Sequence, residues 1–290
     1  MASTADAVAA PSVVPPGRAV DLPGRGTTFI REVAGPPGAP TVVLLHGLSA
    51  TGGLNWVSAF EPLGRHYRVI AIDHRGHGHG IRTGRFRLAD CADDVAALAD
   101  VLSVESLIPV GYSMGGPIAQ LLWHRHRPLV SGMVLCATAR NFRRNAHEIG
   151  LWSVLPFVTA GMRTAPGVAR RAVMSQVMAL RMPQFNGREW VLDELSGNDP
   201  AAIAEAAGAL ARFSSHDWIG GVDVPTAVVV TERDSLVGPE RQRRLADSIP
   251  GARVFPVDGD HGVCISAPRL FIPALQSALM AVTTLAARPI

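Results

Sequence analysis

The sequence predicts an α/β fold, in which helices cover a mostly parallel β-sheet and a helical segment is inserted into the chain. Short runs of almost only apolar residues, such as the run from Thr41 to Leu45, are typical of buried parallel strands. Between these runs, apolar residues recur at helical spacing. The interval 140–220 contains no such run and separates two strand-bearing parts. A chain of 290 residues is long enough for one domain of this kind.

Composition narrows the classes of function. The chain has 27 basic and 24 acidic residues, and its net charge of +3 is too small and too dispersed to indicate nucleic-acid binding. Every basic residue is an arginine, which excludes a Schiff-base lysine and a P-loop lysine. The three cysteines lack C-x-x-C spacing and favour a reducing compartment, so we expect a cytoplasmic protein.

The segment 73–80 alternates histidine and glycine after a predicted strand. A metal site is the alternative interpretation of this segment. Side chains in such a glycine-rich turn need not converge on one point, so the segment is a weak predictor of a metal centre. We therefore expect neither a metal nor a cofactor.

The chain divides into four predicted parts. Residues 1–25 are expected to form a flexible tail. Its first 16 residues are rich in alanine, valine, proline and serine and have no basic start before an apolar run, so they are not interpreted as a signal peptide. Residues 26–139 and 221–290 are expected to form the two halves of one α/β core. Residues 140–220 are expected to form a helical lid over that core.

The first half of the core contains the patterns of five strands and three helices. The predicted strands cover residues 28–33, 41–45, 68–72, 107–110 and 133–136. The predicted helices cover residues 55–65 and 88–104, and a third follows Ser113 and ends near Arg127.

The lid is predicted to contain helices over residues 146–161, 167–182, 189–195 and 200–213, the last with Asp199 at its N-cap. Its apolar residues either pack on the core or form a wall of the substrate pocket. The pocket candidates are Trp152, Leu155, Phe157 and Met178. Eight arginines and one acidic residue lie between positions 140 and 188. These arginines either form a solvated face, bind an acidic ligand or contact a membrane surface.

The second half of the core is predicted to contain strands over residues 226–230 and 253–257 and a helix over residues 239–249. The uncharged run 270–287 has the minimum length of a membrane span. It contains proline, glutamine, serine and threonine, so we interpret it as a final helix that packs on the core.

The stretch from Gly111 to Gly115 follows the G-x-S-x-G pattern, with Ser113 at its centre. An apolar run precedes it and a helical pattern follows it, which is the context of a nucleophile elbow. Glycines are needed there because the sharp turn leaves little room for a Cβ atom. The pattern therefore predicts a nucleophilic serine exposed at the edge of the sheet.

Two backbone N–H groups are candidates for an oxyanion hole. Met114 follows the serine at the start of a helix, where negative charge is favoured. Leu48 follows His46-Gly47 at the end of another predicted strand, where a second donor is expected.

Asp234 and His261 follow the last two predicted strands. Functional groups gather at the carboxyl edge of such a sheet, so we expect both to approach Ser113. A neutral imidazole can take the proton of a serine hydroxyl, and a carboxylate can orient that imidazole. Competing carboxylates are Glu232, Asp258 and Asp260; the last two are neighbours of His261 on one loop and poorly placed to orient its ring.

Together these motifs resemble those of the α/β-hydrolase superfamily over nearly the whole chain. The matching residues are His46-Gly47, Asp73-x-Arg75-Gly76-x-Gly78, Gly111-x-Ser113-x-Gly115-Gly116, Asp234 and His261. The segment 111–137 is also similar to lid-bearing esterases, 3-oxoadipate enol-lactonases and cofactor-free perhydrolases. The resemblance implies an eight-stranded, mostly parallel sheet with a helical lid between the sixth and seventh strands.

The chain departs from the family pattern at Gly80, where a serine is frequent, and at Asp260, where a glycine is frequent. Asp260 directly precedes His261, and a carboxylate there is expected to perturb the pKa of the imidazole and so the pH optimum. A serine at the elbow, where dehalogenases and epoxide hydrolases of this fold carry an aspartate, points to acyl chemistry.

These observations lead to the hypothesis of a serine hydrolase, similar to carboxylesterases and lipases, that cleaves carboxylic esters of apolar acyl groups. The expected partner is a small ester or lipid-like substrate, with peripheral membrane contact through the lid left open. The alternatives are a lactonase or C–C bond hydrolase acting on ring-cleavage products, an acyltransferase, and a ligand-binding protein without turnover. The sequence does not indicate an oligomeric state.

Overall fold

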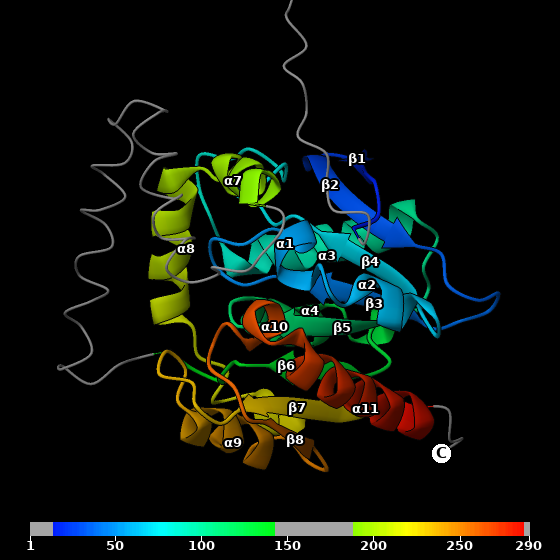
Figure 1. Cartoon of the computed structure of the whole chain (residues 1–290), viewed down its shortest axis with the longest axis vertical. Helices are drawn as coiled ribbons and strands as arrows, with labels where there is room; N and C mark the ends of the chain where they lie inside the picture. The colour runs from blue at the N-terminus through cyan, green and yellow to red at the C-terminus, as the bar shows by residue number, and fades with distance from the viewer. Residues whose placement is uncertain (1–13, 143–187, 287–290) are drawn as a thin grey trace, which may run out of the picture.

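A computed structural model describes residues 14–142 and 188–286. They form an eight-stranded sheet in the order β1-β2-β4-β3-β5-β6-β7-β8 (Figure 1). Strand β2 is antiparallel to both of its neighbours, and the other neighbouring strands pair in parallel. The prediction of a mostly parallel, eight-stranded α/β fold is therefore confirmed.

Seven of the eight strands lie where the apolar runs predict them. The strands are β1 (Gly17–Leu22), β2 (Gly26–Val33), β3 (Thr41–Leu45), β4 (Arg68–Ile72), β5 (Leu107–Tyr112), β6 (Met133–Cys136), β7 (Thr226–Thr231) and β8 (Arg253–Val257). The prediction of a flexible tail was wrong for β1, which lies inside residues 1–25. Val20 and Leu22 of β1 are buried and alternate with exposed residues, a period-two pattern hidden by its charged members.

The described helices follow the predicted order, except that one predicted helix is divided in two and the short helix α10 was not predicted. They are α1 (Gly52–Trp56), α2 (Phe60–Gly64), α3 (Leu88–Val101), α4 (Gly115–Arg125), α7 (Arg188–Ser196), α8 (Pro200–Arg212), α9 (Pro239–Asp247), α10 (Val263–Ser266) and α11 (Pro268–Ala286). The predicted helix 55–65 was wrong as a single element and forms α1 and α2 instead. Thr51 caps α1 at the Leu54 N–H, and Pro62 in a continuous helix would remove the bond to Ser58.

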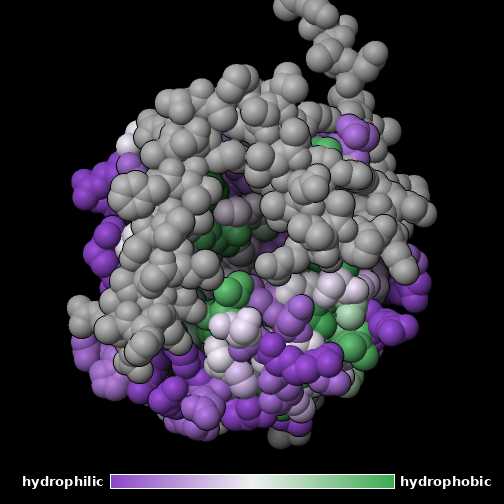
Figure 2. All heavy atoms as spheres, turned by 60° about the vertical axis from the view of Figure 1, so that its left-hand side comes forward, coloured by the Kyte–Doolittle hydropathy of each residue, from purple (hydrophilic) through white to green (hydrophobic). Residues whose placement is uncertain are grey.

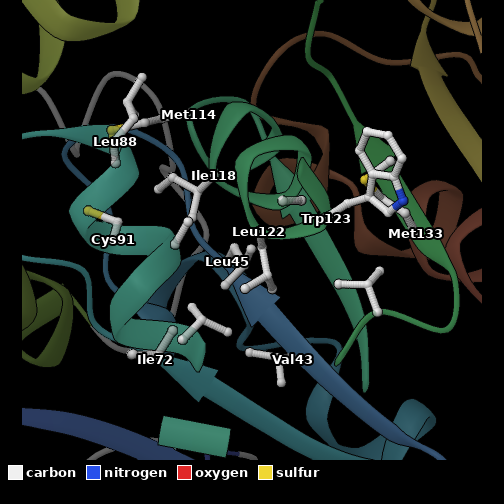
Figure 3. Close-up of a cluster of buried hydrophobic side chains, with 14 of the residues drawn as sticks. Val43, Leu45, Ile72, Leu88, Cys91, Met114, Ile118, Leu122, Trp123 and Met133 are labelled. Carbon is white, nitrogen blue, oxygen red and sulfur yellow. The ribbon is translucent and has the colours of Figure 1, made fainter. Parts of the chain in front are cut away.

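Both faces of the sheet are buried. In β3, Val43 and Leu45 face one core and Val42 and Leu44 face the other, because successive side chains of a strand alternate. On the first face, residues of α3 and α4 pack on the strands (Figure 3). Helices α1, α2, α10 and α11 cover the second face. The sheet therefore lies between two hydrophobic cores.

Helix α11 is the one described helix that is long and apolar enough to span a membrane. In the structure it packs against β7 and β8. Its fully buried residues include Leu275, Ala278 and Leu279, which recur at helical spacing on one side of the helix. This arrangement agrees with the interpretation of the run as a final core helix.

The described part of the predicted lid contains α7, α8 and the 3₁₀ turn Ile219–Gly221. Helix α8 begins at Pro200, and the Asp199 side chain accepts a hydrogen bond from the Ala201 N–H, as the N-cap pattern predicts. The predicted helices 146–161 and 167–182 lie outside the described residues. So do the four candidate pocket residues Trp152, Leu155, Phe157 and Met178.

Candidate active site

Ser113 occupies a sharp turn between β5 and α4. Its backbone φ of 52° lies in the left-handed region, which non-glycine residues rarely adopt. The turn is possible because a Cβ atom on Gly111 would lie 2.3 Å from the Gly115 carbonyl oxygen, and one on Gly115 would lie 2.1 Å from the Leu45 carbonyl oxygen. The Thr138 hydroxyl donates to the Ser113 carbonyl at 2.8 Å and holds the turn against β6.

His261 lies between β8 and α10 and connects two other predicted site residues. Its Nε2 atom is 2.9 Å from Ser113 Oγ, and its Nδ1 atom is 2.6 Å from Asp234 Oδ2. The Tyr112 hydroxyl donates to the His261 carbonyl at 2.8 Å and fixes the loop that carries the ring. The structure therefore brings together a hydroxyl, an imidazole and a carboxylate from the ends of β5, β8 and β7.

Asp234 is buried and its carboxylate is fully engaged. Oδ1 accepts hydrogen bonds from the backbone N–H groups of Leu236 and Val237, each at 2.8 Å, and Oδ2 accepts one from the Thr231 hydroxyl at 2.8 Å. Burial raises the pKa of Asp234, but the hydrogen bond and charge of His261 and the Val237 and Thr231 donors outweigh it, so the pKa lies below its ordinary value. Asp234 is therefore ionised at neutral pH.

Sequence reasoning missed the side chain that organises this carboxylate. Gln242 on α9 is fully buried, and its Nε2 atom lies 2.7 Å from Thr231 Oγ1 and 3.3 Å from Asp234 Oδ2. Its Oε1 atom accepts from the Thr231 N–H at 3.0 Å. The available sequence signal was an uncharged polar residue among the charged residues of the predicted helix 239–249.

The competing carboxylates make other contacts. Glu232 pairs with Arg243 at 2.5 Å, and Asp258 pairs with Arg233 at 2.9 Å. Asp260 accepts from the Gly262 N–H at 2.9 Å. Among the described residues, none of the three is hydrogen-bonded to the His261 ring.

The two predicted oxyanion donors flank Ser113. Met114 lies at the N-terminal end of α4, and the loop that carries Leu48 lies against the serine, since a Cβ atom on Gly47 would be 3.3 Å from Ser113 Cβ. Neither N–H group donates a hydrogen bond to another described residue. Unpaired N–H groups beside a nucleophile are the arrangement that stabilises an oxyanion.

Comparison with known proteins agrees with this geometry. A family model for the alpha/beta hydrolase fold matches residues 40–268. The chain belongs to the alpha/beta hydrolase fold family. The resemblance drawn from the motifs is therefore confirmed.

Individual relatives of this hydrolase are distant. A pimeloyl-[acyl-carrier protein] methyl ester esterase from Chromobacterium violaceum is 28% identical over 83% of this chain and 94% of its own. A putative carbamate hydrolase from Agrobacterium fabrum is 27% identical over 83% and 94% of the two chains. The crystal structure of an enol-lactonase from Burkholderia xenovorans LB400 superposes with a TM-score of 0.73 over 91% of this chain and all of its own, at 24% identity. The structural similarity shows the fold alone.

The buried ring of His46 sets the orientation of the Leu48 N–H in this hydrolase. His46 Nε2 accepts a hydrogen bond from the His74 N–H at 3.0 Å, so the ring proton lies on Nδ1, which donates to the Gly47 carbonyl at 2.8 Å. The Leu48 N–H belongs to the same planar trans peptide as that carbonyl and points the opposite way. Asn55 supports the loop by accepting from the Gly47 N–H at 3.0 Å.

Asn198, between α7 and α8, connects the predicted lid to the same loop. Its Nδ2 atom donates to the Ser49 carbonyl at 2.9 Å, and its Oδ1 atom accepts from the Gly78 N–H at 2.8 Å. Ser49 follows Leu48 and has a φ of 63°, a conformation that needs support from its neighbours. Asn198 is therefore a positioning residue for the candidate oxyanion loop.

Replacing Asn198 with alanine should lower kcat for ester hydrolysis about tenfold and change KM less than about twofold. Complete removal of one oxyanion donor typically lowers kcat roughly 100-fold or more. A donor that is only loosened should lose part of this effect, and the loss should appear in kcat because the donor stabilises the transition state. Steady-state kinetics measure both constants. Ser196→Ala is the matched control, since that side chain bonds only within its own helix turn. A rise in KM at constant kcat would contradict the positioning role.

Three neutral imidazoles are packed together behind this loop. The ring centroids of His74 and His77 lie 4.3 and 5.2 Å from that of His46, and all three residues are buried. Burial lowers the pKa of His74 to about 3 and that of His77 to about 4, and it lowers the pKa of His46 well below its usual range. Within the part of the chain that the structure describes, no group of side chains is arranged to hold a metal ion.

The free energy of unfolding should therefore fall as the pH falls from about 6.5 toward 4. Each buried imidazole stays neutral in the folded protein but is protonated in the unfolded chain, at a loss of about 1.4 kcal/mol per pH unit below about 6.5. Asp73 opposes this trend, since burial raises its pKa to about 6 and its contribution to stability grows as the pH falls from 6 to 4. The stabilisation from this one carboxyl group is smaller than the loss from three imidazoles, so the free energy of unfolding still falls.

Urea unfolding at pH 7.5, 6.0 and 5.0 measures this dependence. His74→Leu should flatten it by the share of one imidazole, because neither nitrogen of the His74 ring has a hydrogen-bond partner among the described residues. His66→Gln is the control, because His66 is exposed. An unchanged slope in His74→Leu would show that the buried ring does not couple to folding.

Proposed function

We propose that this protein is a serine hydrolase that cleaves carboxylic esters through an acyl-enzyme. The observation that carries the proposal is the His261 ring, which is hydrogen-bonded to Ser113 Oγ through Nε2 and to the Asp234 carboxylate through Nδ1. This arrangement supplies a base for the serine proton and a carboxylate that stabilises the resulting imidazolium.

The geometry supports a two-stage reaction. Ser113 Oγ attacks the ester carbonyl carbon as its proton passes to His261 Nε2, and the negative oxygen is held by the N–H groups of Leu48 and Met114. The C–O bond to the alcohol then breaks, and His261 protonates the departing alcohol. Water, deprotonated by His261, attacks the acyl-enzyme and releases the acid and free Ser113. Asp234 keeps the imidazole oriented in both stages.

The acyl group is proposed to be apolar. Figure 2 brings the α8 side of the molecule forward and shows a hollow in which the visible described atoms are mostly hydrophobic. Esterases occur among the relatives, such as the methyl ester esterase described above, which supports a small ester as the substrate class. Cleavage of lactones or of C–C bonds in ring-cleavage products uses the same groups and is the second candidate, since the excess of arginine between positions 140 and 188 would suit a carboxylated substrate.

Hydrolysis of p-nitrophenyl esters from acetyl to palmitoyl tests the proposal. We expect turnover with an optimum at a chain length that reports the size of the pocket. If no ester is hydrolysed but a fluorophosphonate still labels Ser113, the substrates to test next are lactones and ring-cleavage products. No labelling would favour a binding protein without turnover. Product analysis with added alcohols distinguishes acyl transfer from hydrolysis.

A further inference from the structure

We propose that an arginine-lined cavity beside the candidate active site binds a carboxylate carried by the substrate. This inference rests on the proposed function and narrows its substrate class to esters in which an apolar hydrocarbon chain ends in a carboxylate. The cavity has a volume of about 520 Å³ and lies between the segments that follow β6 and β7. It is lined by Ala139, Arg140, Asn141, Ser235, Leu236, Gly238, Pro239, Glu240, Arg241 and Arg244.

The cavity adjoins the site through both of its walls. One wall begins at Ala139, directly after Thr138, whose hydroxyl is bonded to the Ser113 carbonyl. The other wall begins at Ser235, directly after Asp234. Both walls leave the sheet at the edge where its parallel strands end, which is where ligands of such sheets bind. The cavity therefore lies at the same edge of the sheet as Ser113, and the proposed substrate extends from its ester group at Ser113 into the cavity.

The wall after β6 is held in place by buried hydrogen bonds. Gln120 Nε2 donates to the Ala139 carbonyl at 3.3 Å, and the Ser215 N–H donates to the Arg140 carbonyl at 2.8 Å. The Ser215 hydroxyl also lies 2.6 Å from Gln120 Oε1, and both residues are fully buried. The Arg140 side chain therefore extends from a well-anchored backbone, which reduces the entropy lost when a ligand binds.

The cavity carries an excess of positive charge, with three arginines and one glutamate in its lining. Arg140 is oriented by a 2.5 Å bond to Ser248 Oγ, and Arg241 by a 2.6 Å bond to the Asn141 carbonyl. The partner of Arg140 is neutral, so it does not cancel the charge of that guanidinium. Among the described residues, neither Arg140 nor Arg244 forms an ion pair with a carboxylate. A guanidinium presents five N–H donors in a fork that matches a carboxylate.

The nearby Asp234 does not repel an anion from this cavity. Its oxygens accept bonds from Leu236, Val237 and Thr231 and are turned into the protein, where His261 faces the carboxylate. The Leu236 side chain is 41% exposed and lines the same cavity. The cavity thus combines apolar surface with guanidinium groups, which suits a short hydrocarbon chain that ends in a carboxylate.

The test compares matched esters on the whole protein. Mono-p-nitrophenyl esters of glutaric, adipic and suberic acid are assayed beside p-nitrophenyl esters of monocarboxylic acids of equal length. Phenyl acetate and 4-carboxyphenyl acetate place the carboxylate on the alcohol side. We expect a lower KM for the carboxylated member of at least one pair. Arg244→Gln should raise that KM about threefold to tenfold, as expected for a charged hydrogen bond at an exposed site, and leave the KM of the neutral ester unchanged.

Arg243→Gln is the matched control. Arg243 is the neighbour of Arg244 on α9, is also exposed, and pairs with Glu232 away from the cavity. Arg243 carries the same charge as Arg244, so an effect of net charge alone on KM would appear in both variants. Equal effects of the two substitutions, or KM values that do not distinguish the charged from the neutral esters, would overturn the inference while leaving the esterase proposal intact.

Calorimetric titration with adipate separates the two proposals if no ester is cleaved. Binding by the wild type that weakens in Arg244→Gln but not in Arg243→Gln would support the cavity independently of turnover. Absence of adipate binding would overturn it. Inorganic phosphate serves as the competing probe, and binding of phosphate as tight as that of adipate would reassign the cavity to anions in general and overturn the substrate carboxylate.

Discussion

Ser113→Ala should lower kcat for p-nitrophenyl ester hydrolysis by about 10⁴- to 10⁶-fold, the largest loss expected from any single substitution in this protein. The hydroxyl is the only group in the arrangement that can form the acyl-enzyme, and it is hydrogen-bonded to His261 Nε2 at 2.9 Å. The oxyanion donors remain in the variant, so slow residual hydrolysis above the uncatalysed rate is expected.

Two further measurements make this result interpretable. The variant should lose labelling by a fluorophosphonate, because no nucleophile remains to be phosphorylated, and should unfold at nearly the same urea concentration as the wild type, because only one oxygen atom is removed. Ser131→Ala serves as a control, since its hydroxyl only approaches the Leu107 carbonyl at 3.4 Å. Full esterase activity in Ser113→Ala would refute the nucleophile assignment.

Asp234→Asn should lower kcat by about 10⁴-fold. The carboxylate lies 2.6 Å from His261 Nδ1 and is ionised, because the donors around it hold its pKa below the ordinary value. An asparagine can turn its NH₂ group toward the ring and favour the wrong imidazole tautomer, and it carries no charge to stabilise the imidazolium. The substitution is nearly isosteric, so the fold should be kept. The NH₂ group would nevertheless replace an oxygen that accepts from Thr231 and Gln242, which should lower the free energy of unfolding by about 1–3 kcal/mol.

Asp260→Asn is the matched comparison for this second result. Asp260 precedes His261 in the chain but accepts a hydrogen bond from the Gly262 N–H and not from the ring. We expect activity within about twofold of the wild type, since surface charges away from a reacting group act weakly. A larger loss in Asp260→Asn than in Asp234→Asn would show that the carboxylate next to His261 orients the imidazole.

Much of the fold was predictable because it depends on local patterns. The runs at Thr41–Leu45, Arg68–Ile72 and Met133–Cys136 are strands with the predicted bounds, since nearly every residue in them is buried on a two-sided sheet. Strand β1 was missed because it lies at the edge of the sheet, and its exposed charged residues interrupt the apolar pattern. The single helix over 55–65 was wrong because its apolar spacing concealed the break before Pro62.

The sequence by itself determined the elements and the strand ends at which Ser113, Asp234 and His261 lie. Only the tertiary structure decided which carboxylate faces the imidazole, since Asp260 is the neighbour of His261 in sequence while Asp234 is its neighbour in space. The support of the oxyanion loop by Asn198 is likewise a contact between distant segments. Side-chain periodicity reports burial along one element, whereas a hydrogen bond depends on the distance and angle between two elements, which the packing of the whole domain sets.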